Sequence, residues 1–115
     1  MRRRPPAKEE EGMPVIMTFR VQGDPDKLEQ LAAENRDVLQ AIANQAKEHG
    51  LIAHRFYGTD GWIMVVDEWP NAESFQRFYE SQRGTIEPIM RQVASGEPEI
   101  RFWRKLETHD DVGWE

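Results

Sequence analysis

The hydrophobic period of the chain changes in a fixed order that few folds can satisfy. Between residues 13 and 106, apolar side chains recur first at every second position, as in a strand, and then at every third or fourth, as in a helix. Two strand-like runs, a second helical stretch and a last strand-like run follow. Strands are expected in four segments, 14–21, 51–57, 62–69 and 99–106. The sequence therefore predicts the order β-α-β-β-α-β.

Capping and turn residues set the limits of the first helix. Asp24 can accept hydrogen bonds from free backbone amides, and Pro25 suits the first helical position. Gly50 is expected to end the helix, because glycine readily adopts the left-handed conformation found there. A helix that spans all of residues 25–49 is long for a globular protein, so a kink is expected near Asn35.

The second helical stretch is predicted in two pieces. Asn71 is expected to cap a short helix, and Gly84 to separate it from a further helical piece over 85–95. Pro88 would be tolerated there because it falls in the first turn of that piece.

This order of elements predicts an α+β, ferredoxin-like fold. Two helices would lie on one face of a four-stranded antiparallel sheet, with right-handed crossovers. The other face of the sheet must then meet water, a ligand or a second subunit.

Length and composition limit the class of protein. A chain of 115 residues is one domain, and its lack of cysteine excludes disulfides, thiolate metal sites and a thiol nucleophile. No apolar run approaches the length of about 18 residues that a membrane span needs. No signal peptide is recognised, so a cytoplasmic protein without a membrane partner is expected.

The charge is unevenly distributed. Residues 1–12 carry a formal +1 and are expected to form a disordered tail, whereas the rest of the chain carries −7. A body this acidic repels phosphate backbones, so no nucleic-acid partner is expected. The domain is expected over 13–106, and residues 107–115 form a short acidic C-terminal tail.

The expected hairpin brings an imidazole next to a carboxylate. Asp60-Gly61 between two strand-like runs predicts a tight turn, and loops of two or four residues place His54 opposite or diagonal to Asp67. We expect this pair on the sheet face that the helices leave uncovered. Three roles remain open: a buried pair that fixes the sheet register or a dimer contact, a ligand contact, and a catalytic base.

Four other residues are candidate ligand contacts. Arg20 and Thr18 share a strand face, and Arg20 is suited to an anionic or carbonyl group of a ligand. Trp69 is expected to stack on a flat ligand, and Phe56 shares the face of His54. The alternatives are an exposed or interface arginine and aromatic side chains that belong to the core or to an interface. No metal is expected, because the adjacent residues 109–111 of the tail seldom converge on one ion.

Two segments resemble the dimeric α/β barrel superfamily, and especially small proteins of the antibiotic-biosynthesis-monooxygenase type. Residues 65–69, Val-Val-Asp-Glu-Trp, lead into Ala72-Glu73-Ser74-Phe75 as the acidic-x-Trp strand end of that family leads into a helix. Residues 50–56 are similar to the second strand of uncharacterised bacterial members. The resemblance implies that two subunits pack sheet to sheet and that each encloses a cavity. Some members oxidise polycyclic aromatic substrates with molecular oxygen alone, and others bind or degrade haem.

The resemblance also limits the cofactor. Many members carry a histidine nine residues after the tryptophan, where this chain has Phe78, and the haem-degrading branch uses a helix histidine that is missing from 85–95. Haem is therefore disfavoured and no cofactor is expected. Of the candidate site residues, only Asp67 and Trp69 match the pattern of the oxygenases in that family. His54 is a candidate because of the expected strand pairing alone.

These observations predict a homodimer with a ligand site. The uncovered sheet face would be buried against a second copy, and Trp114 could anchor across that contact. The first interpretation is a cavity for a small, flat, apolar ligand, with oxygenase or isomerase chemistry in which His54 is the base and Asp67 orients it. The alternatives are a non-catalytic sensor or carrier and a structural dimerisation module.

Overall fold

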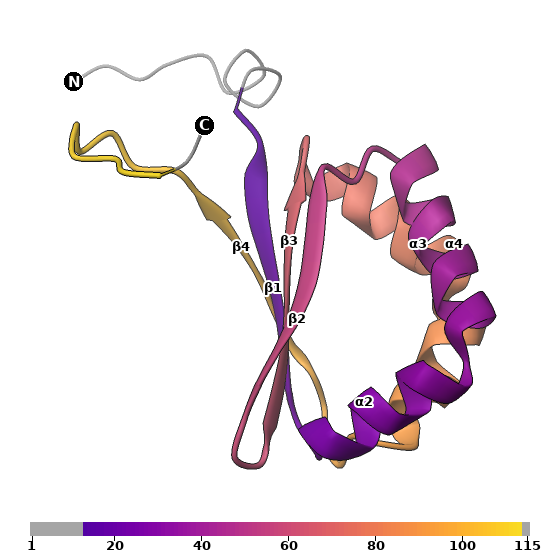
Figure 1. The fold of residues 1–115 in the computed structure, drawn as a ribbon. Helices are drawn as coiled ribbons and strands as arrows, with labels where there is room; N and C mark the ends of the chain where they lie inside the picture. Colours follow the sequence, from indigo (N-terminus) through magenta and orange to yellow (C-terminus); the bar gives the residue numbers. More distant parts are fainter. Residues whose placement is uncertain (1–12, 114–115) are drawn as a thin grey trace.

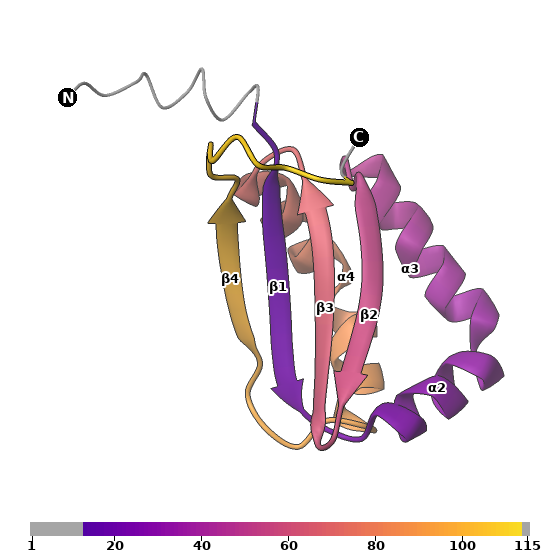
Figure 2. The same cartoon turned by 60° about the vertical axis from the view of Figure 1, so that its left-hand side comes forward.

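The computed structural model describes residues 13–113, which form one antiparallel sheet covered by helices. Figures 1 and 2 show the strands in the spatial order β2-β3-β1-β4, which is the ferredoxin-like order. The elements are β1 (Val15–Gln22), α2 (Pro25–Glu34), α3 (Arg36–Glu48), β2 (Ala53–Thr59), β3 (Trp62–Trp69), α4 (Ala72–Arg91) and β4 (Glu99–Arg104). The predicted fold class and all four predicted strands are confirmed.

The hairpin of β2 and β3 has the tighter of the two expected turns. Thr59 pairs with Trp62, so only two residues form the turn, and Gly61 adopts a φ of +81°. This positive φ suits glycine because other residues meet steric strain there. In this register His54 lies directly opposite Asp67.

The first helical stretch is divided where the kink was expected. Helix α2 ends before Asn35 and α3 begins after it, and the side chain of Asn35 donates a hydrogen bond to the carbonyl of Leu31 at 2.9 Å. Asp24 caps α2 by accepting from the amides of Asp26 and Lys27 at 3.0 and 3.3 Å. Both features confirm the sequence analysis.

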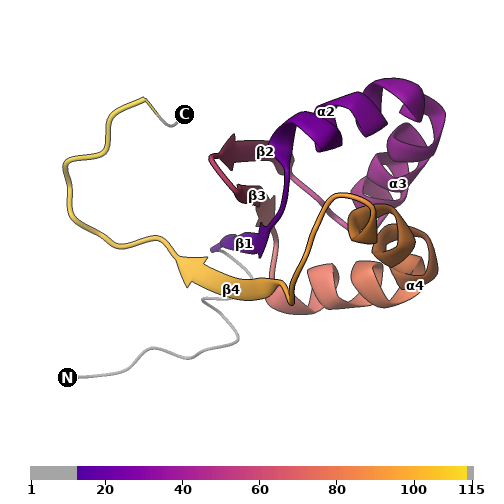
Figure 3. The same cartoon turned by 90° about the horizontal axis from the view of Figure 1, so that it is seen from below.

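The prediction of two separate pieces for the second stretch is wrong. Helix α4 continues through Gly84 to Arg91, with Pro88 in its interior instead of its first turn. Gly84 has open space around it, so the helix crosses this position without a steric obstacle. Figure 3 shows that the two halves of α4 run in different directions, as expected for a proline inside a helix.

The core lies between the sheet and the helices. Met17, Val21, Ile63 and Trp69 are the largest fully buried side chains, and all four come from the helix-facing side of β1 and β3. Figures 1 and 3 show that all three helices cover this one face and leave the other without cover from any element within 13–113. We call the uncovered side the open face.

The described part of the chain ends in a segment without regular secondary structure. After β4, residues 105–113 form neither helix nor strand. Residues 1–12 and the proposed anchor Trp114 lie outside the described residues. Within 13–113 no helix is both long and apolar enough to cross a membrane.

Candidate functional site

A cavity of about 150 Å³ lies between the helices and the sheet. Its walls are almost entirely apolar, and the polar side chains among them are those of His54, Asp67 and Tyr79. Such a composition is typical of sites for small apolar ligands, in which a few polar groups fix the orientation. The lining consists of Met17, Phe19, His54, Phe56, Val65 and Asp67 from the sheet, Leu51 from the preceding loop, and Leu39, Ile42, Ala43, Ala46, Phe75, Phe78, Tyr79, Ile86, Ile89 and Met90 from α3 and α4.

The imidazole and the carboxylate form a direct hydrogen bond at the sheet wall. Nδ1 of His54 lies 2.7 Å from Oδ1 of Asp67, and the two residues come from paired positions of β2 and β3. Because the carboxylate accepts, we assign the proton of the neutral ring to Nδ1, which leaves the lone pair of Nε2 available. The side chain of His54 is 36% exposed and that of Asp67 only 6%, so the imidazole is the accessible member of the pair.

Trp69 supports this pair from inside the core. Its indole Nε1 donates to Oδ2 of Asp67 at 3.0 Å, so both carboxylate oxygens of the buried Asp67 have a partner. Trp69 itself has no exposed surface and packs against Phe75 and Phe78, with ring centroids 5.7 and 5.6 Å away. The proposed stacking of Trp69 on a ligand is therefore wrong. Its contact with Asp67 makes it a positioning residue.

The expected location of the His54–Asp67 pair was also wrong. Both side chains face the helices, whereas the sequence analysis placed them on the uncovered side of the sheet. Strand alternation showed which residues share a face but not which face the helices cover. The helices cover the more apolar face of the sheet, which contains Ile63 and Val65. The polar pair is tolerated on this face because His54 and Asp67 bind one another.

Arg20 and Thr18 lie on the open face, on the opposite side of the sheet from the cavity. Arg20 pairs with Glu99 at 3.3 Å and lies 4.9 Å from the ring centroid of Trp62, and Thr18 accepts a hydrogen bond from the indole of Trp103 at 2.8 Å. They therefore cannot contact a ligand in the cavity. The prediction that they share a strand face is confirmed, and this face is the uncovered one, whereas His54 lies on the covered face.

Of the proposed ligand contacts, only Phe56 lines the cavity. It lies beside His54 in an edge-to-face arrangement, with ring centroids 5.2 Å apart. Phe56 is 41% exposed, so solvent reaches this part of the wall.

The sequence analysis did not identify Tyr79, the polar side chain that α4 contributes. The helical spacing of Phe75, Phe78 and Tyr79 shows that they share one side of α4, which was the available signal. Burial and the neighbouring carboxylate of Glu87 raise the pKa of the Tyr79 phenol above its ordinary value, and Arg83 opposes this shift. Within residues 13–113, no group of three or more potential metal ligands is gathered in one place.

Comparison with known proteins gives structural matches alone. No protein-family model and no curated protein sequence matches the chain. A cofactor-independent oxygenase from Streptomyces nogalater, SnoaB, matches with a TM-score of 0.59 and 16% identity, over 86% of this chain and 99% of that one. A dimeric ferredoxin-like protein from an uncultured marine organism matches with a TM-score of 0.60 and 14% identity, over 88% of this chain and 95% of that one. An antibiotic biosynthesis monooxygenase matches with a TM-score of 0.60 and 7% identity, over 81% of this chain and 99% of that one.

These matches define the class of fold. The chain has the ferredoxin-like fold that these proteins share, and this is the fold that the sequence resemblance implied. At 7–16% identity the likeness extends to the fold and not to the residues of a site.

Proposed function

We propose that the protein binds a small, flat and largely apolar hydroxyaryl ligand in its cavity and oxidises it with molecular oxygen. The observation that carries this proposal is the 2.7 Å His54–Asp67 hydrogen bond at the wall of an otherwise apolar cavity. An imidazole exchanges protons near neutral pH, and a carboxylate on one ring nitrogen orients the other toward a substrate. The likeness to a cofactor-independent oxygenase supports this reading at the level of fold.

The proposed chemistry begins with a proton transfer. Nε2 of His54 accepts the proton of the ligand hydroxyl, and Asp67 stabilises the imidazolium ion that forms. The resulting aryloxide is electron-rich and reacts with oxygen at a ring carbon that carries hydrogen. One oxygen atom enters the ligand as a new carbonyl, and the other leaves as water with the ring hydrogen and the hydroxyl proton. A phenol and one molecule of oxygen thus give a quinone and one molecule of water.

The size of the cavity limits the ligand. An apolar cavity of about 150 Å³ accommodates a benzene ring. The described cavity has this volume, so it holds one aromatic ring without movement of the helices. A ligand with more rings would have to extend toward the exposed side near Phe56.

We propose further that two copies pair through the open face. Ile16, Met64 and Val66 place apolar side chains there without cover from any described element. Arg20 and Glu99 form an ion pair on the same face, so it is more polar than the sequence analysis predicted. A structurally similar protein is dimeric, which supports the pairing. In this arrangement each cavity lies within one subunit, behind the sheet.

Oxygen consumption with phenol, a hydroxyaryl compound whose single ring matches the cavity volume, tests the proposed reaction directly. The wild-type protein should consume oxygen and form the quinone, and with ¹⁸O₂ the product should carry one labelled atom. His54→Gln should lower the turnover about 10²- to 10⁴-fold, which is the usual contribution of a general base. His109→Gln is the matched control, because His109 lies in the C-terminal segment away from the cavity, and it should retain wild-type turnover.

Two results would contradict parts of this proposal. Binding of phenol without oxygen consumption would indicate a non-catalytic sensor or carrier that uses the same cavity. Absence of both binding and turnover would reject the ligand site and leave a structural dimerisation module.

A further inference from the structure

Tyr79 contributes a polar group to the helix side of the cavity. The other two polar side chains in the lining, His54 and Asp67, belong to the sheet, whereas Tyr79 belongs to α4. A ligand held between these two layers therefore has the imidazole of His54 on one side and the side chain of Tyr79 on the other. The proposed function uses the first group and leaves the second without a role.

The hydroxyl of Tyr79 is weakly engaged within the protein. It donates to Oε2 of Glu87 at 3.4 Å, which is longer than the usual O–H···O distance of about 2.5–3.0 Å. Burial and the charge of Glu87 disfavour ionisation, so the phenol keeps its proton and remains a donor. Little interaction energy is therefore lost when this hydroxyl turns to another acceptor.

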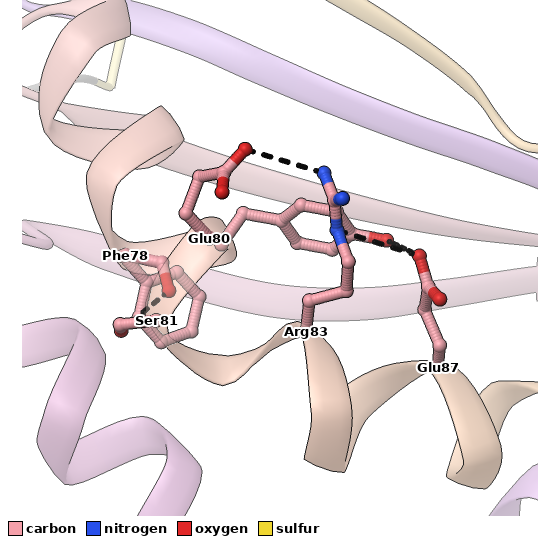
Figure 4. Close-up of polar contacts among 6 residues, drawn as sticks. Phe78, Glu80, Ser81, Arg83 and Glu87 are labelled. Atoms are coloured by element: carbon pink, nitrogen blue, oxygen red, sulfur yellow. Dashed lines mark hydrogen bonds and ion pairs between the residues drawn. The ribbon is translucent and has the colours of Figure 1, made fainter.

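Glu87 does not depend on Tyr79 for a partner. Arg83 and Arg91 lie 3.7 and 3.6 Å from its carboxylate oxygens. Figure 4 shows the guanidinium group of Arg83 between the carboxylates of Glu80 and Glu87. The charge of Glu87 thus remains paired when Tyr79 leaves it.

Space is present on both sides of Tyr79. A second hollow of about 230 Å³ shares Phe19, Tyr79, Ile86 and Met90 with the cavity, so Tyr79 lies between the two spaces. Its ring stacks on Phe75 with the centroids 5.7 Å apart, and its hydroxyl bonds to Glu87, which lines the second hollow and not the cavity. Rotation of the whole side chain would bring the hydroxyl from the second hollow to a ligand in the cavity.

We infer that Tyr79 is a specificity-determining residue, whose hydroxyl leaves Glu87 and donates a hydrogen bond to a carbonyl oxygen of the bound ligand. The inference rests on the proposed function, because it assumes a ligand whose hydroxyl faces His54. It narrows the substrate class to hydroxyaryl carbonyl compounds, in which one aromatic ring carries both groups. The carbonyl also withdraws electrons from the ring and makes the hydroxyl proton easier to transfer.

Four one-ring ligands separate the contributions of the two polar groups. These are 4-hydroxyacetophenone, acetophenone, 4-ethylphenol and ethylbenzene, which have similar shapes and carry both groups, the carbonyl, the hydroxyl or neither. Their dissociation constants would be measured by calorimetry or ligand-observed NMR. In the wild-type protein the carbonyl should improve affinity about three- to ten-fold, as one net hydrogen bond does.

Two substitutions should change this carbonyl advantage in opposite directions. Tyr79→Phe keeps the ring and should abolish the advantage. Glu87→Ala removes the competing acceptor and should increase the advantage, an effect that a purely structural role of Tyr79 would not produce. Affinity for ethylbenzene should remain within about two-fold in both variants, since that ligand forms no hydrogen bond, and this controls for a damaged fold.

The outcomes distinguish this inference from the proposed function. A carbonyl advantage that persists in Tyr79→Phe, or that falls in Glu87→Ala, would overturn the role of Tyr79. A hydroxyl advantage that persists in His54→Leu, which has no acceptor for the ligand hydroxyl, would overturn the proposed role of His54 while leaving the carbonyl contact of Tyr79 intact.

Discussion

A buried carboxylate with two different donors determines what His54 can do. Asp67 binds the imidazole through one oxygen and the indole of Trp69 through the other, so it can neither rotate freely nor turn toward solvent. The accessible nitrogen of His54 is thereby held at the cavity wall. One residue of β2 and two of β3 form this unit.

Substitution of Asp67 should reveal this dependence in the stability of the protein. Asp67→Ala leaves the buried indole donor of Trp69 without a partner and should lower the free energy of unfolding by about 1–3 kcal/mol. Asp67→Asn keeps an acceptor for that donor and should cost less. Urea denaturation of both variants measures the difference. Equal losses would show that the Trp69 contact does not depend on a hydrogen-bond acceptor at residue 67.

The phenol of Tyr79 should titrate late. Its pKa is raised by burial and by Glu87, so the folded protein keeps the phenolic proton above pH 10, the ordinary tyrosine value, where the unfolded chain loses it. The associated stability is present below pH 10 and is lost as the pH rises through the folded pKa. Tyr57→Phe leaves Tyr79 as the one remaining tyrosine. In this variant the tyrosinate absorbance should rise with a midpoint above 10, and a midpoint below 10 would contradict the buried position.

At the scale of elements, the continuity of α4 determines the shape of the cavity. This helix supplies both Phe75 near its start and Met90 near its end to the lining, and its two halves run in different directions around the same space. Two separate helices would not fix these residues relative to one another. Gly84 is therefore an interior position of α4 and not a helix boundary.

Gly84→Ala should stabilise the protein. Open space surrounds Gly84 in a continuous helix, and replacing a helical glycine by alanine contributes about 0.5–1 kcal/mol. Thermal or urea denaturation measures the change. Gly58→Ala is the contrasting control, because an added Cβ would lie 2.8 Å from Cβ of Pro25, and it should destabilise. A destabilising Gly84→Ala would indicate a helix break at this position.

The elements and pairings that depend on local chemistry could be predicted from the sequence. The Asp60-Gly61 turn and the alternation of the two strands sufficed to place His54 opposite Asp67, and the length of the helix before Gly50 sufficed to place the break at Asn35. The side of the sheet that the helices cover depends on which face is more apolar. Arg20 marks the polar face and Ile63 the apolar one, but the covered face could be identified only by comparing the side chains of all four strands.

The site could be predicted only in part for a related reason. Trp69 lies on the same side of the sheet as the cavity, yet Phe75 and Phe78 pack over it and exclude it from the lining. Tyr79 follows Phe78 directly, and the sequence alone does not show that its side chain lines a cavity. Both outcomes depend on how α4 packs, which no local pattern specifies.

At the scale of the whole molecule, the two faces of the sheet differ in what they contact. The covered face carries the cavity, and we propose that the open face carries the contact with a second subunit. Val66 lies on the open face, next to the buried Val65 and Asp67 in β3. Substitutions on one face should therefore leave the other intact.

Val66→Arg should prevent dimerisation without changing ligand binding in the cavity. A charged side chain in the centre of the proposed contact should convert a dimer of about twice 13.5 kDa into a monomer, as measured by light scattering. Ligand affinity of the cavity should change less than about two-fold. Val38→Arg, at an exposed position of α3, is the control and should remain dimeric. A wild-type mass near 13.5 kDa would contradict the dimer.

The most direct test of the central claim is the ¹⁵N NMR spectrum of the His54 ring with and without a bound hydroxyaryl ligand. The protein has 3 histidines, so the His54→Gln spectrum assigns the signals. We predict that addition of 4-hydroxyacetophenone shifts Nε2 from the position of a free, unprotonated nitrogen to that of a hydrogen-bonded or protonated one, while Nδ1 remains bonded to Asp67. An Nε2 signal that is unchanged when the ligand is bound would contradict the account.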